Sequence, residues 1–235
     1  MTKPHNEPHN KEMAKRSNWL RAAVLGANDG IVSTAGLVVG VAGATDSKII
    51  ILTAGLAGIV SGALSMAAGE YVSVSTQRDI EKTLLHKERE ELRLYPEQEL
   101  EELALIYQSK GLKKSTALIV AKELTEKDAF AAHVDVELNI DPDNLTNPWS
   151  AAFASATSFF AGALIPVAII MLPLGKLSIP VTFVSVVFAL ILTGALSGRA
   201  SGAVIKKSII RVVAGGLIAM VVTFAIGHLV NLSGI

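Results

Sequence analysis

The sequence predicts an all-α integral membrane protein with five transmembrane helices and a cytoplasmic helical bundle inserted between the second and the third. Two observations support this fold class. The 235 residues are 51% hydrophobic and only 18% charged, with a mean hydropathy of +0.48, so the chain is more apolar than an ordinary globular protein. The acidic residues are also concentrated in one internal polar segment. An apolar chain interrupted by one polar block is typical of a membrane protein with an inserted domain.

Five runs with almost no charged residues are close to the length of about 20 residues that a membrane-spanning helix needs. We expect these helices at residues 22–45, 49–71, 149–172, 177–198 and 212–233. Basic residues precede the first run and fill the connection between the fourth and the fifth. By the positive-inside rule, the N-terminus is then cytoplasmic. Two crossings return the chain to the cytoplasm, so the polar block lies there too.

The chain order predicts four parts. Residues 1–18 are polar and lack the apolar core of a signal peptide, so we expect a disordered tail there. The first two spans occupy 19–76, the helical insert 77–147 and the last three spans 148–235. The absence of cysteine excludes disulfides, thiolate metal sites and cysteine nucleophiles. Any metal must therefore be bound through oxygen, imidazole or thioether.

An aspartate stands inside the first expected span. A charged side chain there costs about 2.5–3.5 kcal/mol on insertion scales and usually faces a protein interior or a water path. On a helix, Asp29 shares a stripe of small residues with Gly26, Ser33, Gly36 and Gly40, along which another helix can approach. We expect Asp29 to face protein and to be a ligand in a transport pore. The alternative is a carboxylate that only joins helices through a hydrogen bond.

The second span has the same design, with a stripe of small residues beside Met66 and Glu70. Methionine alone is an ordinary packing residue, but beside Asp29 its thioether becomes a candidate ligand. Glu70 stands one turn further on, near the cytoplasmic end, where a carboxylate lines the entrance of a pore or lies in the membrane interface. The predicted pore residues are thus Asp29, Met66 and Glu70.

The insert is acidic, and its pattern indicates four short helices. It carries 16 of the 21 acidic and 10 of the 21 basic residues, so its net charge is −6 and that of the remaining chain is +6. Pro96 suits a first helical position, Gly111 a C-terminal cap, and Thr125 an N-cap with Asp128 three residues later. We expect the first of these helices to continue directly from the second span.

Helical periodicity separates the acidic residues that face the interior of the insert from those that face water. Glu97 and Glu101 are on the outward face of their helix, whereas the inward group also includes an imidazole. The inward residues are Glu81, Glu88, Glu91, Glu99, Glu102, His133 and Glu137. Carboxylates inside a helical bundle are typical of metal sites. The alternatives are acids that are only solvated or paired with neighbouring lysines and arginines, and an imidazole that only caps the bundle edge.

These residues resemble the vacuolar iron transporter family. The similar motifs are LGANDGIVSTAGLVVGV, SGALSMAAGEYVSVSTQRD, PEQELEELALIYQSKGL and HVDVELNI, and the resemblance covers about residues 16–235. The family is described as dimers of five-span subunits with the pore between the subunits. Its cytoplasmic helical domain binds divalent metal through glutamates, and its transport is proton-coupled and moves iron out of the cytosol. The resemblance therefore implies a homodimer with protons as the counter-ion.

Carried over position by position, the resemblance implies that Asp29 and Met66 are the pore ligands. It also implies that the glutamates of the metal-binding domain are Glu88, Glu91, Glu99, Glu102 and Glu137. Two adjacent positions depart from the family, because His133 and Val134 stand where the family has methionine ligands. Nitrogen in place of sulfur keeps affinity for Fe²⁺ and also suits Mn²⁺, Co²⁺ or Zn²⁺.

The resulting interpretation is a proton-coupled exporter of divalent iron, with manganese as a second substrate, rather than an enzyme. Its expected partners are a second copy of the chain and the lipid bilayer, the cell membrane in a prokaryote, with no nucleic acid and no organic cofactor. A carboxylate must release its proton to bind metal, which gives a physical reason for exchange. The competing interpretation is a membrane-anchored metal-binding or oxidising protein whose glutamate-rich domain is the active part. A purely structural scaffold would leave the inward acids unexplained.

Overall fold

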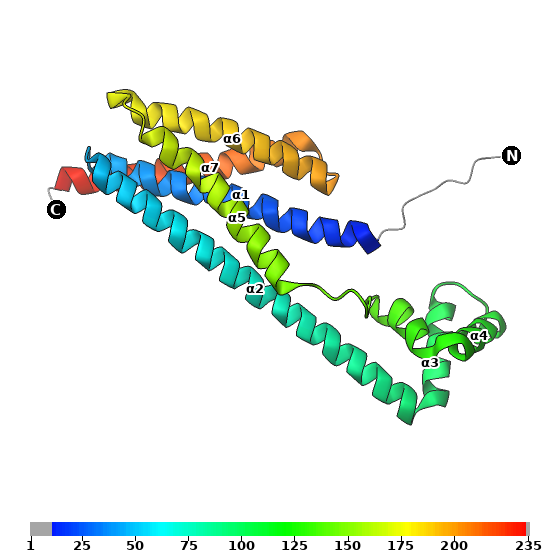
Figure 1. Ribbon diagram of the computed structural model, residues 1–235. Helices are drawn as coiled ribbons and strands as arrows, with labels where there is room; N and C mark the ends of the chain where they lie inside the picture. The colour runs from blue at the N-terminus through cyan, green and yellow to red at the C-terminus, as the bar shows by residue number, and fades with distance from the viewer. Residues whose placement is uncertain (1–10, 234–235) are drawn as a thin grey trace. The chain divides into compact units, whose positions relative to one another are not determined.

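The computed structural model describes residues 11–233, and the side chains of residues 22–232. This part of the chain is helical and contains no β-strand, so the all-α prediction is confirmed. The long helices are α1 (Lys11–Ala44), α2 (Lys48–Leu94), α5 (Pro148–Ile170), α6 (Ser178–Ser201) and α7 (Ile205–Ser233) (Figure 1). The shorter elements are α3 (Pro96–Ser109), α4 (Lys114–His133), the π-helical turn η1 (Val134–Leu138) and the 3₁₀ turn η2 (Gly175–Leu177).

The chain divides into two compact units. The first, called the apolar unit here, holds the described residues up to Val72 and those from Pro148 onward, and the second, the insert unit, holds Ser73–Asn147. Helix α2 contributes its first half to the apolar unit and its second half to the insert unit. Five helices of the described chain are long and apolar enough to cross a membrane. The protein is therefore an integral membrane protein.

Two helix boundaries differ from the sequence prediction. Of the tail predicted at 1–18, residues 1–10 lie outside the described residues, and helix α1 begins at Lys11, before the predicted start of the first span. Helix α7 begins at Ile205, so the lysines and Arg211 assigned to a loop stand in its first turns. Gly202 ends α6 in the left-handed conformation (φ 65°), which allows a connection of very few residues. Lysine and arginine are good helix formers, so the helix extends beyond its apolar stretch.

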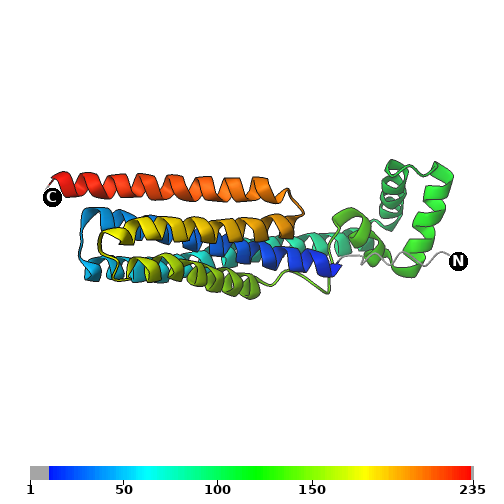
Figure 2. The same cartoon turned by 90° about the horizontal axis from the view of Figure 1, so that it is seen from above.

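Helix α1 is the central helix of the apolar unit and contacts α5, α6 and α7. Figure 2 shows these helices running side by side. A Cβ at Gly26 would collide with α5 at Ser155, and a Cβ at Gly40 would press on α7 at Thr223. Gly36 also faces Thr223. The glycines of the predicted stripe therefore do allow close helix approach, and their neighbours are α5 and α7 of the same chain.

Apolar packing joins the helices of this unit in two clusters. The first lies between α1, α2 and α5 and includes Val38, Ile59 and Phe159. The second lies between α1, α6 and α7 and includes Leu190 and Met220. Many other large apolar side chains are exposed on α2, α5, α6 and α7. In water such surfaces would be costly, whereas in a bilayer they face lipid of the same polarity.

Polar contacts of Lys48 connect three helices at one end of the apolar unit. Lys48 Nζ, at the start of α2, donates to the carbonyl oxygen of Ile170 at the end of α5, and it lies 3.4 Å from Ser178 Oγ at the start of α6. A cation at a helix C-terminus satisfies carbonyl groups that have no partner in the helix. Since α6 starts at this end, its C-terminal Arg199 and the basic start of α7 lie at the opposite end.

The insert unit has the expected succession of helices, with one correction. Pro96 opens α3 and Gly111, with φ 101°, follows its end, as predicted. Thr125 is not an N-cap, because the helix continues through it and breaks at Asp128, whose φ is −167° and ψ 97°. Asp128 Oδ1 accepts a hydrogen bond from the Ala131 backbone N–H at 2.9 Å. Asp128 is thus the cap of the last segment, since its side chain satisfies a free N–H of the new helical turn.

Candidate metal centre

Three buried side chains from three helices meet in the insert unit. Glu88 on α2, Glu99 on α3 and His133 at the end of α4 are 3%, 6% and 0% exposed. One ligand atom of each lies within 4.8 Å of the other two, a separation at which they could hold one metal ion. Glu137, on η1, completes the group. We call these four residues the acidic centre.

The imidazole is in the middle of the acidic centre. His133 Nδ1 lies 3.0 Å from Glu88 Oε1, 3.4 Å from Glu137 Oε2 and 3.6 Å from Glu99 Oε2. The other ring nitrogen, Nε2, is buried and has no hydrogen-bond partner. Glu88 Oε1 is also buried and accepts no hydrogen bond, although Nδ1 is close to it. The ligand atoms of His133, Glu88 and Glu99 therefore surround a common point, and Glu137 approaches the imidazole beside them.

The local sequence explains how these side chains come together. On α3, Glu99 stands one turn before Leu103, which is fully buried against α4, so the carboxylate turns to the same side. The break at Asp128 redirects the last segment of α4. A contact that the sequence did not reveal holds this segment to α2, since the Arg89 guanidinium lies over the Phe130 ring at 4.3 Å. Residues 134–138 then form the π-helical turn that carries Glu137.

The pKa values of the two buried glutamates indicate that the acidic centre favours an additional positive charge. The pKa of Glu88 is raised to about 7, chiefly by burial and next by the charge of Glu137, while His133 acts in the opposite direction. Burial also raises the pKa of Glu99, followed by the charge of Glu102. Carboxylates that are pushed toward their neutral form need a proton or a cation close by. A divalent ion at the common point would supply that charge.

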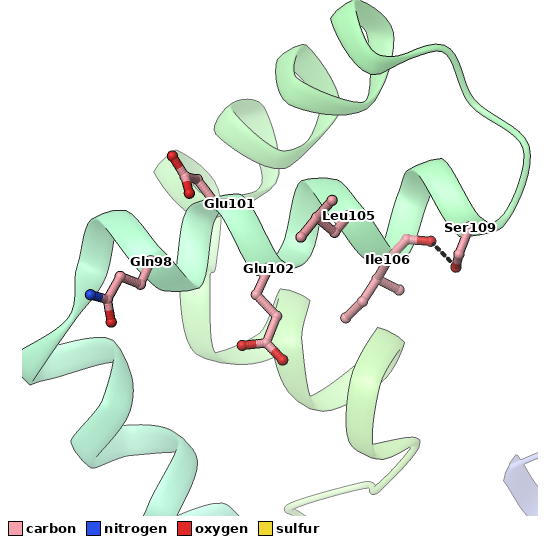
Figure 3. Close-up of a pocket in the computed structure, with 6 residues that line it drawn as sticks. All are labelled: Gln98, Glu101, Glu102, Leu105, Ile106 and Ser109. Carbon is pink, nitrogen blue, oxygen red and sulfur yellow. Dashed lines mark hydrogen bonds between the residues drawn. The ribbon is translucent and has the colours of Figure 1, made fainter.

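Two predicted ligands lie at the rim and not in the centre. Glu91 pairs with Lys87 at 2.9 Å, and its side chain is 32% exposed. Glu102 is exposed and, with Glu101, lines an open pocket of about 520 Å³ along α3 (Figure 3). The sequence placed these two glutamates on opposite faces. The reason for the difference is that α3 packs against α4 and η1 on the side of Glu99, whereas the flank with Glu102 stays open.

Glu81, also predicted to face inward, is half-buried on α2. One of its oxygens accepts a hydrogen bond from Gln77 Nε2 at 2.9 Å, and the other is buried without a hydrogen-bond partner. Glu97 is exposed, as its predicted outward position requires. Periodicity therefore identified the buried face of α2 correctly, but it did not show how far each acid is from the imidazole.

The predicted pore residues are distributed over two helices of the apolar unit. Asp29 on α1 is half-buried, and its backbone carbonyl accepts a hydrogen bond from Ser33 Oγ at 2.6 Å. Ser33 itself is exposed, so the small-residue stripe is not covered along its whole length. On α2, Met66 packs against the first apolar cluster, and Glu70 is half-buried. Within one chain, these side chains are only partly enclosed.

The fold and the acidic centre define an integral membrane protein with a buried carboxylate and imidazole group suited to a divalent metal. The model of the VIT family matches residues 20–228. A vacuolar iron transporter of Acanthamoeba castellanii is 42% identical over 215 residues, covering 91% of this chain and 79% of the relative. Vacuolar iron transporter homolog 2.1 of Arabidopsis thaliana is 35% identical and covers 96% and 87%. The chain therefore belongs to the VIT family, a family of transporters.

Proposed function

We propose that this protein exports divalent iron from the cytosol in exchange for protons. The observation that carries the proposal is the acidic centre, in which two buried carboxylates and one buried imidazole share a common point and Glu137 stands beside the imidazole. The relatives are named as iron transporters. Iron is thus the first substrate, with Mn²⁺ as a second one, because carboxylate oxygen also suits manganese.

The insert unit acts as the capture site on the cytoplasmic side. Its net charge of −6 attracts cations to the surface, where Glu91 and Glu102 stand at the rim. Glu88, Glu99, Glu137 and His133 then replace the water around the ion. The N-terminus shares the cytoplasmic side, because the basic residues of the α6 and α7 ends mark that face.

The apolar unit supplies the path across the bilayer. Asp29 carries the one acidic side chain of the α1 span, and Met66 and Glu70 contribute a thioether and a carboxylate from α2. Charged groups in a span mark ion pathways. Because Asp29 and Glu70 are only half-buried within one chain, a second copy is proposed to complete the pore at a homodimer interface.

Proton exchange follows from competition for the same oxygens. A carboxylate that binds metal must first be deprotonated, so a proton gradient across the membrane drives metal in the opposite direction. Asp29 is the residue proposed to alternate between metal and proton, since it lies within the span. The competing function is a membrane-anchored protein that binds or oxidises metal at the acidic centre without transport.

Flux in proteoliposomes tests the proposal. The purified protein is reconstituted, Fe²⁺ is added outside under anaerobic conditions, and entry is followed with an internal chelating dye while a pH gradient, acidic inside, is imposed. We expect uptake that requires the gradient and disappears in Asp29→Asn. Uptake independent of the gradient would remove proton coupling. No uptake, together with metal binding or iron oxidation by the same sample, would favour the anchored protein.

A further inference from the structure

The acidic centre contains one feature that carboxylates alone do not require, which is the imidazole at its middle. Anionic oxygens are sufficient to bind hard divalent cations such as Mg²⁺, Ca²⁺ and Mn²⁺. His133 is nevertheless the most completely buried member of the group, with no exposed surface. A polar ring buried this deeply needs a partner for each nitrogen, and Nε2 has none. The carboxylates all lie at the other nitrogen, Nδ1, so that atom is the one that a metal ion would bind.

The contacts of Nδ1 leave one neighbouring carboxylate oxygen without a hydrogen bond. Nδ1 lies 3.0 Å from Glu88 Oε1, which is close enough for a hydrogen bond, yet that oxygen accepts none. Nδ1 makes its hydrogen bond with Glu137 Oε2 instead, at a long distance of 3.4 Å. Glu88 Oε1 and Nδ1 are thus close together without a bond between them, as two ligands of one metal ion are, because each ligand directs a lone pair at the ion.

The separations also match the edges of a coordination polyhedron. With metal–ligand distances of about 2.1 Å, neighbouring ligands are about 3.0 Å apart in an octahedron and about 3.4 Å apart in a tetrahedron. The nitrogen–oxygen separations at His133 are 3.0, 3.4 and 3.6 Å. A divalent ion would therefore fit between Nδ1 and the carboxylates with small side-chain movements. Glu137, whose side chain is 30% exposed, provides the open side through which it would enter.

We propose that His133 binds the transported metal through Nδ1 and is the residue that selects borderline divalent ions over hard ones. This inference rests on the proposed function, since it assigns a role within the capture site. Imidazole nitrogen binds Fe²⁺, Co²⁺ and Zn²⁺ more strongly than Mg²⁺ or Mn²⁺, whereas carboxylates discriminate less. A neutral ligand also limits the charge of the centre, because a fourth carboxylate would strengthen attraction for every cation alike.

The inference makes Zn²⁺ and Co²⁺ better competitors of Fe²⁺ than Mn²⁺ at this centre. It also identifies the substitution that tests the nitrogen ligand most directly. Asparagine places an amide oxygen close to the position of Nδ1, so His133→Asn replaces nitrogen by a hard oxygen at nearly the same point. The matched control is His86→Asn, because His86 is an exposed histidine on α2 that is not part of the acidic centre.

The experiment uses the full chain in nanodiscs and two probes. Pulsed electron paramagnetic resonance of bound Mn²⁺ reports whether a nitrogen nucleus is coupled to the ion, and competition with Zn²⁺ gives the ratio of the two dissociation constants. In the unmodified protein and in His86→Asn we expect nitrogen coupling. In His133→Asn we expect that coupling to disappear and the preference for Zn²⁺ over Mn²⁺ to fall by about tenfold or more.

The outcomes separate this inference from the proposed function. Metal binding that depends on Glu88 and Glu99 but shows no nitrogen coupling in the unmodified protein overturns the role of His133 and leaves the capture site standing. Nitrogen coupling that persists in His133→Asn also overturns the role of His133. The measurement on the unmodified protein uses no variant, so it tests the inference even if His133→Asn misfolds. If no Mn²⁺ or Zn²⁺ binds at the centre, the capture site itself is wrong.

Discussion

The acidic centre and the Asp29 region both offer carboxylates to a metal, but one chain encloses only the first. Glu88, Glu99 and His133 are buried within a single insert unit, and their ligand atoms lie within 4.8 Å of one another. Asp29 is half-buried on α1, one turn from an exposed serine. The difference fits the two roles proposed above, because capture and passage make different demands on a site. A capture site has to hold an ion, whereas a site in a path must stay accessible and release it.

The substitution with the largest expected effect on one site alone is Asp29→Asn, which keeps the shape of the side chain and removes its charge. We expect flux to fall by about two orders of magnitude, because no other acidic residue stands in the α1 span. Metal binding at the acidic centre should be unchanged, since that centre is built from α2, α3, α4 and η1. Proteoliposome flux and equilibrium binding on the same preparation check both halves. Normal flux in this variant would contradict the assignment of Asp29 as a pore ligand.

The converse change is the double variant Glu88→Gln with Glu99→Gln. Binding at the acidic centre should weaken by about 100-fold, because two buried charged ligands become neutral. Flux at saturating metal should fall less, since Asp29 remains. The matched control is Glu97→Gln with Glu101→Gln, which removes the same charge from the exposed flank of α3. Calorimetric titration of both proteins makes the comparison, and equal losses would mean that only net charge matters.

The pH dependence of the metal-free protein gives a third test. The pKa of Glu88 is raised to about 7 by burial and by Glu137, against an ordinary value of 4.5, and that of Glu99 is raised as well. The folded state therefore holds these protons more tightly than the unfolded state. The stability from Glu88 is fully present below about pH 4.5 and is lost as pH rises to about 7.

Thermal unfolding between pH 5 and pH 8 would show this loss, and Glu88→Gln should reduce it. Metal affinity should change in the opposite direction and rise over the same interval, because the ion competes with the proton on Glu88. A metal-free protein whose stability increases with pH in this window, with Glu88 intact, would contradict the burial of that carboxylate.

A smaller effect is expected from Met66→Ala. A thioether adds a soft, uncharged ligand, so its removal should change the rate or the selectivity of transport by a few fold rather than abolish it. Flux of Fe²⁺ and Mn²⁺ measured in parallel provides the readout, and unfolding temperature controls for the packing of Met66 against the apolar cluster. A loss as severe as that of Asp29→Asn would show that Met66 is essential to the path.

The helices could be predicted because their causes are local. Apolar runs fix the long helices, Pro96 and Gly111 bound α3, and glycine spacing predicts the close packing at Gly26 and Gly40. The break at Asp128 was placed at Thr125, because both residues suit an N-cap and only the backbone shows which one is used. Local pattern thus determines element type better than element ends.

The acidic centre could be predicted only in part. Periodicity finds Glu88 and Glu99 on buried faces, but it gives Glu102 nearly the same direction, and the structure leaves Glu102 exposed on an open pocket. Which flank of α3 is covered depends on where α4 lies, and that depends on the Asp128 break and the Arg89–Phe130 contact. These are tertiary causes, so one helix at a time does not reveal them.

The most direct test of the central claim is to locate the metal. Crystals of the full chain grown with Co²⁺, measured at the cobalt absorption edge, would give an anomalous peak at each bound ion. We predict a peak about 2.1 Å from His133 Nδ1 and from oxygens of Glu88 and Glu99. A peak only in the open pocket beside Glu101 and Glu102, or no peak at the acidic centre with cobalt in excess, would contradict the account.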